Sequence, residues 1–230
     1  MQVIGLLGGM SWESSAQYYR LINQTVREKL GGTNSARSLM WSMDFGEIEH
    51  LQHTGQWDVL AQKMVEAALN LQRGGADFIV ICTNTMHRMY EQLVQALDIP
   101  VLHIADPTGA KIVADGVQRV ALLGTAFTME QPFYKERLQT QYGLEVLVPD
   151  ETDRHTVHRI IYEELVAGQV LDASRQQYQQ VIERLAERGA QAVILGCTEI
   201  MLLIQPQDSC LPVYDTTTLH ALAAVEQALR

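Results

Sequence analysis

Two short blocks of this sequence combine residue types that can act as acids, bases or ligands. They are Cys82-Thr83-Asn84-Thr85 and Gly196-Cys197-Thr198-Glu199. Each block follows an apolar, β-branched run of strand length, so the pattern predicts a strand that ends there and a helix that begins after it. At the carboxyl ends of parallel strands, backbone N–H groups and the helix dipole can bind an anion. The sequence therefore predicts two candidate anion sites, each of which carries a cysteine.

A thiol at such a position can donate or accept a proton near neutral pH. Its unperturbed pKa is about 8.5, and a helix N-terminus lowers that value, so we expect a lowered pKa for Cys197. One acid/base group on each side of a carbon is what a racemase needs, because it removes a proton from one face and returns one to the other. The alternative is that Cys197 is a small buried hydrophobic residue, as free cysteines most often are.

The two blocks belong to halves of the chain that repeat each other. Three matches run in the same order: Leu6-Leu7-Gly8 with Leu122-Leu123-Gly124 at an offset of 116 residues, Ala76 with Ala190 at 114, and Pro100-Val101 with Pro212-Val213 at 112. This order predicts two duplicated α/β units. Under the second match, Thr83 corresponds to Cys197 and Cys82 corresponds to Gly196.

The surrounding pattern predicts the elements that must position these residues. The first half should contain strands at 3–7, 38–43, 77–82 and 99–105, and helices at 11–31, 57–72 and 87–97. The second half should contain strands at 118–124, 144–148, 191–196 and 211–213, and helices at 155–167, 172–188 and from 215 onward. Residues 44–58 are predicted to form a long polar loop near a strand end, which is often functional.

The composition favours a small-molecule ligand over a macromolecule. The 230 residues carry a net charge of −10 and an isoelectric point near 5.1, whereas partners such as nucleic acid and anionic membranes recruit Lys and Arg. No apolar run approaches the roughly 18 residues that cross a bilayer, and the start of the chain lacks the basic segment of a signal peptide. We therefore expect a cytoplasmic protein. The three cysteines form no CxxC pair, which fits reduced thiols.

Signals for a cofactor or a metal are weak. The spacing of Gly5, Gly8 and Gly9 is not that of a dinucleotide fingerprint, and His50 and His53 fit a solvated helix face as well as a metal site. The four lysines fall in predicted helices rather than at strand ends: Lys29, Lys63, Lys111 and Lys135. This position disfavours a Schiff base to pyridoxal phosphate. We expect no cofactor and no metal.

Four motifs together resemble the aspartate/glutamate racemase family over essentially the whole chain. They are Gly5-Leu-Leu-Gly-Gly-Met10, Cys82-Thr-Asn-Thr-Met-His87, Leu122-Leu-Gly-Thr125 and Gly196-Cys-Thr-Glu199. The resemblance implies a pyridoxal-independent amino acid racemase, commonly a homodimer, with two pseudo-symmetric domains. Each domain would be a four-stranded parallel sheet flanked by helices, with the active site in the cleft between them. We expect a first domain of residues 1–100 and 208–230, and a second of residues 101–207.

The resemblance also implies site residues, with two departures from the family pattern. In the family each domain contributes one catalytic cysteine, but alignment on Asn84-Thr85 places Thr83, not Cys82, opposite Cys197. Aspartate-using relatives carry a basic residue just before the glycine matched by Gly168, where this chain has Val166-Ala167. The implied substrate contacts are Met10, Gln52, Asn84, Thr85, Thr125, Thr198 and Glu199.

Three alternatives stay open at this point. Cys82 itself is the second acid/base if the chain is shifted by one residue relative to its relatives. A decarboxylase or cis-trans isomerase of the same superfamily would also use a strand-end cysteine. A non-catalytic amino-acid-binding module would have lost one thiol.

Overall fold

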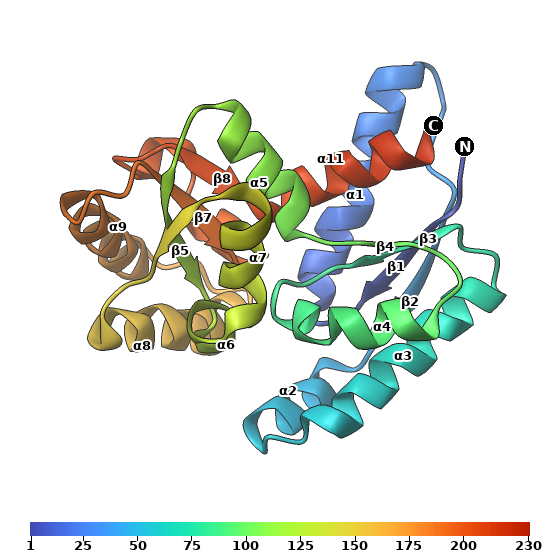
Figure 1. Cartoon of the computed structure of the whole chain (residues 1–230), viewed down its shortest axis with the longest axis horizontal. Helices are drawn as coiled ribbons and strands as arrows, with labels where there is room; N and C mark the ends of the chain where they lie inside the picture. The colour runs from blue at the N-terminus through green and yellow to red at the C-terminus, as the bar shows by residue number, and fades with distance from the viewer. The chain divides into compact units, whose positions relative to one another are not determined.

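The computed structural model describes residues 1–230 and divides into two compact units (Figure 1). The first unit contains Met1–His103 and His220–Arg230, and the second contains Ile104–Leu219. Each unit has one four-stranded, all-parallel sheet with helices on both faces. The predicted fold class of two four-stranded parallel sheets flanked by helices is confirmed.

In the first unit, helices cover both faces of the sheet. The strands lie in the order β2 (Ser38–Ser42), β1 (Ile4–Gly8), β3 (Phe78–Ile81), β4 (Val101–Leu102). Helices α1 (Trp12–Leu30) and α11 (Thr216–Ala228) pack on one face. Helices α3 (Trp57–Arg73) and α4 (Tyr90–Ala96) pack on the other, with α2 (Phe45–His53) and the 3₁₀ helix η1 (Thr85–Met89).

The second unit repeats this arrangement. Its strands lie in the order β6 (Glu145–Leu147), β5 (Arg119–Gly124), β7 (Ala192–Gly196), β8 (Val213–Asp215). Helices α5 (Ala105–Ala114) and α7 (Pro132–Tyr142) pack on one face. The other face carries α6 (Ala126–Glu130), α8 (Glu151–Ile160), the π-helical turn η2 (Ile161–Leu165), α9 (Asp172–Glu187) and α10 (Ile200–Leu203), and the 3₁₀ helix η3 (Pro206–Asp208) follows α10. The identical strand order in the two units agrees with the sequence repeat.

The boundary between the units differs from the one that the sequence predicts. Residues 208–219 lie in the second unit, because β8 pairs with β7 from Val193–Val213 to Leu195–Asp215. Residues 101–103 lie in the first unit, because β4 pairs with β3. After β4 the chain enters the second unit, where α5 packs on the second sheet, and after β8 it returns so that α11 packs on the first. At these two connections, therefore, the helix that follows the strand packs on the other sheet.

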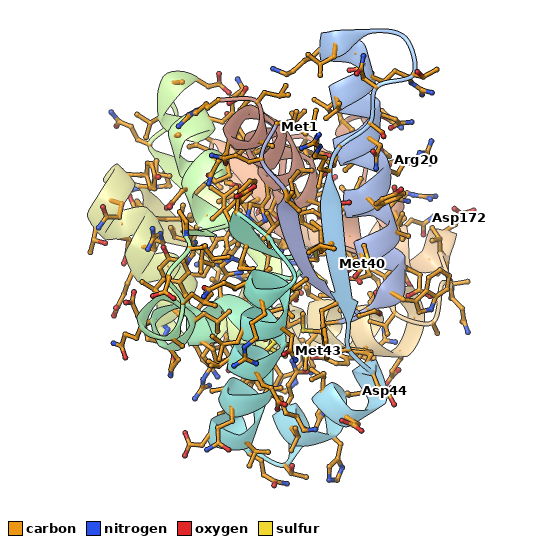
Figure 2. All side chains as sticks on the ribbon, turned by 90° about the vertical axis from the view of Figure 1, so that its right-hand side faces the viewer. Met1, Arg20, Met40, Met43, Asp44 and Asp172 are labelled. Atoms are coloured by element: carbon orange, nitrogen blue, oxygen red, sulfur yellow. The ribbon has the colours of Figure 1, made fainter.

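The segment at 44–58 is a helix followed by a turn, not the predicted loop. Asp44 caps α2, because its carboxylate accepts a hydrogen bond from the Gly46 N–H at 3.0 Å, and Ile48 is buried. Figure 2 shows Met43 and Asp44 at this junction, where β2 ends and the chain turns into α2. Both histidines of α2 are exposed. No group of three or more His, Cys, Asp or Glu side chains in residues 1–230 is arranged to hold a metal ion.

Candidate active site

The first half of the candidate site lies at the carboxyl ends of β1 and β3. After β1 the backbone turns at Gly9, which has a φ of +86°, and a Cβ there would lie 2.2 Å from the Met43 carbonyl oxygen. Only glycine permits this approach. The turn leads to the buried Met10 and to Ser11, whose hydroxyl caps α1. The glycine motif is thus explained by the close contact of two strand ends.

Cys82 is part of the hydrophobic core of the first unit. Its N–H donates to the Leu7 carbonyl at 2.9 Å, which continues the β1–β3 ladder by one residue. Its side chain is 0% exposed and packs with Tyr18 and Val80 on the face that α1 covers. Burial raises the pKa of the Cys82 thiol well above its usual value. At neutral pH this residue is a thiol without access to solvent.

Thr83 follows Cys82 and is 8% exposed. Its carbonyl oxygen lies 2.8 Å from Nδ1 of His87, so the imidazole donates a hydrogen bond to it. The next residues, Asn84 and Thr85, are buried and lead into η1. Gln52 of α2 reaches the same segment, since its Nε2 lies 3.9 Å from the Met86 sulfur.

The second half of the candidate site lies at the ends of β5 and β7. Here the strands approach so closely that a Cβ on Gly124 would lie 2.7 Å from the Gly196 carbonyl oxygen. Thr125 follows β5 and caps α6, because its hydroxyl accepts a hydrogen bond from the Thr128 N–H at 3.3 Å. The adjacent Ala126 N–H donates to Nδ1 of His158 at 3.1 Å. His158, whose ring contacts Phe127 and Tyr162, gave no signal in the sequence.

Cys197 is held as a thiol by its own loop. Its Sγ lies 3.0 Å from Oε2 of Glu199, and the Thr198 hydroxyl lies 2.8 Å from the same oxygen, so the carboxylate accepts both hydrogen bonds. Cys197 is 7% exposed and Glu199 is also buried. Burial raises the pKa of Cys197 well above its usual value, the negative charge and hydrogen bond of Glu199 raise it further, and the N–H groups of Glu199 and Ile200 oppose them. The expected lowering at a helix N-terminus is therefore wrong for this state.

The strand registers place Thr83 and Cys197 at equivalent positions. In the second sheet Gly124 pairs with Gly196. In the first sheet Leu7 pairs with Ile81, so Cys82 comes beside Gly8, which matches Gly124. Cys82 therefore corresponds to Gly196, and the residue after each is Thr83 or Cys197. The sequence offset of 114 residues gives the same equivalence independently of the strand pairing.

Neither unit brings a lysine to a strand end. All four lysines lie within helices: Lys29 in α1, Lys63 in α3, Lys111 in α5 and Lys135 in α7. No helix combines the length and the hydropathy of a membrane-spanning segment.

Comparison with known proteins gives consistent matches over the full length. A family model described as Asp/Glu/Hydantoin racemase matches residues 7–224. The broad specificity amino-acid racemase RacX of Bacillus subtilis (strain 168) is 24% identical in an alignment that covers 99% of this chain and 98% of that protein. A crystal structure of a Yersinia pestis protein assigned to the Asp/Glu racemases is 50% identical, with a TM-score of 0.93 and complete coverage of both chains. An aspartate racemase homologue from Pyrococcus horikoshii OT3 is 31% identical, with a TM-score of 0.86 and complete coverage of both chains.

Proposed function

Because the chain belongs to the Asp/Glu/hydantoin racemase family, we propose that it is an amino acid racemase that uses neither pyridoxal phosphate nor a metal. The observation that carries the proposal is the equivalence of Thr83 and Cys197, which lie at the carboxyl ends of the central strands β3 and β7. In this proposal both residues act on the α-carbon of one amino acid, from opposite faces. The buried residues Met10, Gln52, Asn84, Thr85, Thr125, Thr198 and Glu199 contact the substrate.

The acid/base work is divided unequally between the two residues. Cys197 removes the α-proton from one enantiomer after its own proton has moved to Glu199, which already accepts the thiol hydrogen bond. Thr83 then donates its hydroxyl proton to the opposite face of the carbanion, which gives the other enantiomer. Glu199 then releases its proton to solvent, and solvent returns a proton to the Thr83 oxygen. In the reverse direction the Thr83 oxygen must be ionised to remove the α-proton, and at neutral pH an alcohol is ionised far more rarely than a thiol. Proton transfer on the Thr83 face therefore limits racemisation.

The substrate range extends beyond aspartate and glutamate in this proposal. Aspartate-using relatives place a basic residue where this chain has Val166-Ala167, and Val166 packs on the apolar core of the second unit. No Lys or Arg is among the proposed contact residues, so nothing there favours a second carboxylate. RacX, whose name states a broad specificity, is consistent with this range.

The test is α-hydrogen exchange in D₂O, measured for each L and D amino acid by mass spectrometry and chiral chromatography. We expect both enantiomers of a substrate to approach a racemic mixture with deuterium at the α-carbon. The enantiomer that Cys197 deprotonates should gain deuterium faster than it inverts. The reason is that Cys197 returns a solvent-derived deuteron to the same face of the carbanion many times before Thr83 protonates the opposite face. Release of carbon dioxide would indicate a decarboxylase, and binding without exchange would indicate a binding module.

We propose a cytoplasmic homodimer as the working form, as the family resemblance implies. Several large apolar side chains on α1 and β2 are exposed in the single chain and would suit an interface: Trp12, Tyr19, Met40 and Trp41. Light scattering on the purified protein would test the dimer, and a mass of one chain at micromolar concentration would contradict it.

A further inference from the structure

Three buried histidines meet in the first unit, next to the end of β3. They are His87, His103 and His220, which lie far apart in the sequence. The ring centroid of His87 lies 4.6 Å from that of His103 and 5.8 Å from that of His220. The acid/base chemistry described above uses none of them.

Both nitrogens of His220 are engaged, which fixes its tautomer. Nε2 lies 3.0 Å from the Leu102 carbonyl oxygen, which can only accept, so Nε2 carries the proton. Nδ1 lies 2.9 Å from the Tyr18 hydroxyl and therefore accepts its proton. Burial, and then the neighbouring His87, lower the pKa of His220 to about 3, and the Leu102 carbonyl opposes them. His220 is thus a neutral ring, held in place from β4 and from α1.

The tautomer of His87 follows from the same argument. Its Nδ1 lies 2.8 Å from the Thr83 carbonyl oxygen, which can only accept, so Nδ1 carries the proton and donates it. Thr83 lies beyond the last paired residues of β3, Ile81 with Leu7. Its carbonyl oxygen is therefore bonded by a side chain, one residue beyond the last ladder bond, which Cys82 donates to Leu7.

The rings beside His87 stand at the two connections between the units. The chain leaves the first unit after His103 and re-enters it at His220. The ring of His103 also packs on Tyr90, with centroids 4.7 Å apart. The imidazole that holds Thr83 therefore lies against a ring from the residue after β4 and a ring from α11, and Tyr90 of α4 packs on the first of these, His103.

We propose that His87 is a positioning residue for Thr83: its Nδ1–H fixes the Thr83 carbonyl, and the rings of His103 and His220 fix His87. The inference rests on the proposed racemase function, in which Thr83 donates the limiting proton. Nδ1 of His87 donates to the Thr83 carbonyl oxygen and not to the hydroxyl. In this proposal His87 therefore orients Thr83 through the backbone, and Nδ1 does not exchange a proton with the Thr83 hydroxyl.

The test compares two amide substitutions that differ only in reach. In His87→Asn the side-chain N–H₂ stands close to the position of Nδ1 and can still donate to Thr83, whereas in His87→Gln it stands close to the position of Nε2. We expect His87→Gln to lower racemisation by about ten- to a hundredfold, as a misplacement of about 1 Å does, and His87→Asn to stay within about threefold of the wild type.

Exchange of the α-hydrogen without inversion is an internal control for these variants. Exchange without inversion at the enantiomer that Cys197 deprotonates does not involve Thr83, so His87→Gln should keep it while racemisation falls. Loss of both activities together would show general damage and overturn the positioning role, as would racemisation by His87→Gln equal to that of His87→Asn.

A spectroscopic readout separates this inference from the proposed function. In ¹³C,¹⁵N-labelled protein the Thr83 carbonyl shift should change in His87→Gln and stay near the wild-type value in His87→Asn. An unchanged shift in both variants would overturn the hydrogen bond itself. Absence of any α-hydrogen exchange in the wild type would instead refute the racemase function, and the carbonyl shifts would still decide the role of His87.

Discussion

Burial of His220 should make the first unit sensitive to acid. His220 is 0% exposed, and its burial and the neighbouring His87 lower its pKa to about 3, against about 6.5 in an unfolded chain. Between these two values the unfolded state binds the extra proton. The stability that neutral His220 contributes is therefore complete above pH 6.5 and is lost as the pH falls from 6.5 toward 3.

The size of the effect at pH 4.5 follows from linkage. This pH is about two units below the unfolded pKa, so the unfolded side chain is about 99% protonated, while the folded ring stays almost entirely neutral. Two pKa units correspond to about 2.7 kcal/mol of lost stability relative to pH 7.5. That is a large share of the roughly 5–15 kcal/mol by which folded proteins are stable.

Urea unfolding can measure this loss in the first unit alone. All three tryptophans, Trp12, Trp41 and Trp57, lie in the first unit, so their fluorescence reports its unfolding. From pH 7.5 to 4.5, the free energy of unfolding should fall by about 2.5 kcal/mol more in the wild type than in His220→Gln, whose amide does not titrate. His50→Gln, at an exposed position of the same unit, should behave as the wild type. An equal loss in the wild type and in His220→Gln, to within about 0.5 kcal/mol, would refute the reasoning.

Three further outcomes concern the strand-end residues. Glu199→Gln removes the charge that helps to raise the pKa of Cys197, so iodoacetamide should label Cys197 faster while racemisation falls by about 10²-fold or more; an unchanged labelling rate would contradict the assigned cause. In the wild type at pH 7.5 the exposed Cys210 should be labelled before Cys197, which is buried with a raised pKa, and mass spectrometry of peptides would show the reverse order if the thiol were ionised. Cys82→Ala should cost about 1 kcal/mol of stability and leave racemisation intact, whereas Thr83→Ala should lower racemisation by about 10²-fold; the opposite pattern would make Cys82 the second acid/base.

The fold could be predicted because it depends on local pattern and on the internal repeat. Apolar runs of strand length, each followed by small polar residues, gave the βα junctions, and the repeat gave two units with one strand order. Neighbouring residues of a strand face opposite sides, so the pattern separates Cys82 from Thr83, but that Cys82 faces the core is known only from the structure.

The errors arose where tertiary contacts decide. Nothing in the order of strands and helices shows that α5 packs on the second sheet although it follows β4 of the first, or that α11 packs on the first sheet although it follows β8 of the second. The predicted domain boundary therefore differs from the one in the structure. The raised pKa of Cys197 depends on burial and on the direction of the Glu199 side chain. The helix at 45–53 was predictable in principle, since Asp44 is a good cap and Ile48 and Leu51 share a face, but its many polar residues suggested a loop.

On the proposed mechanism, the raised pKa of Cys197 has a chemical use. A thiolate with a high pKa is a stronger base toward a carbon-bound proton, but at neutral pH it is rarely populated. Glu199 removes part of this difficulty, because it lies 3.0 Å from Sγ and can take the thiol proton within the site. No such carboxylate hydrogen bonds to Thr83, whose neighbour His87 instead donates to the backbone. The first half of the site can therefore supply a proton more easily than it can remove one, which is why the hydroxyl face should limit inversion and why the placement of Thr83 should matter more than its basicity.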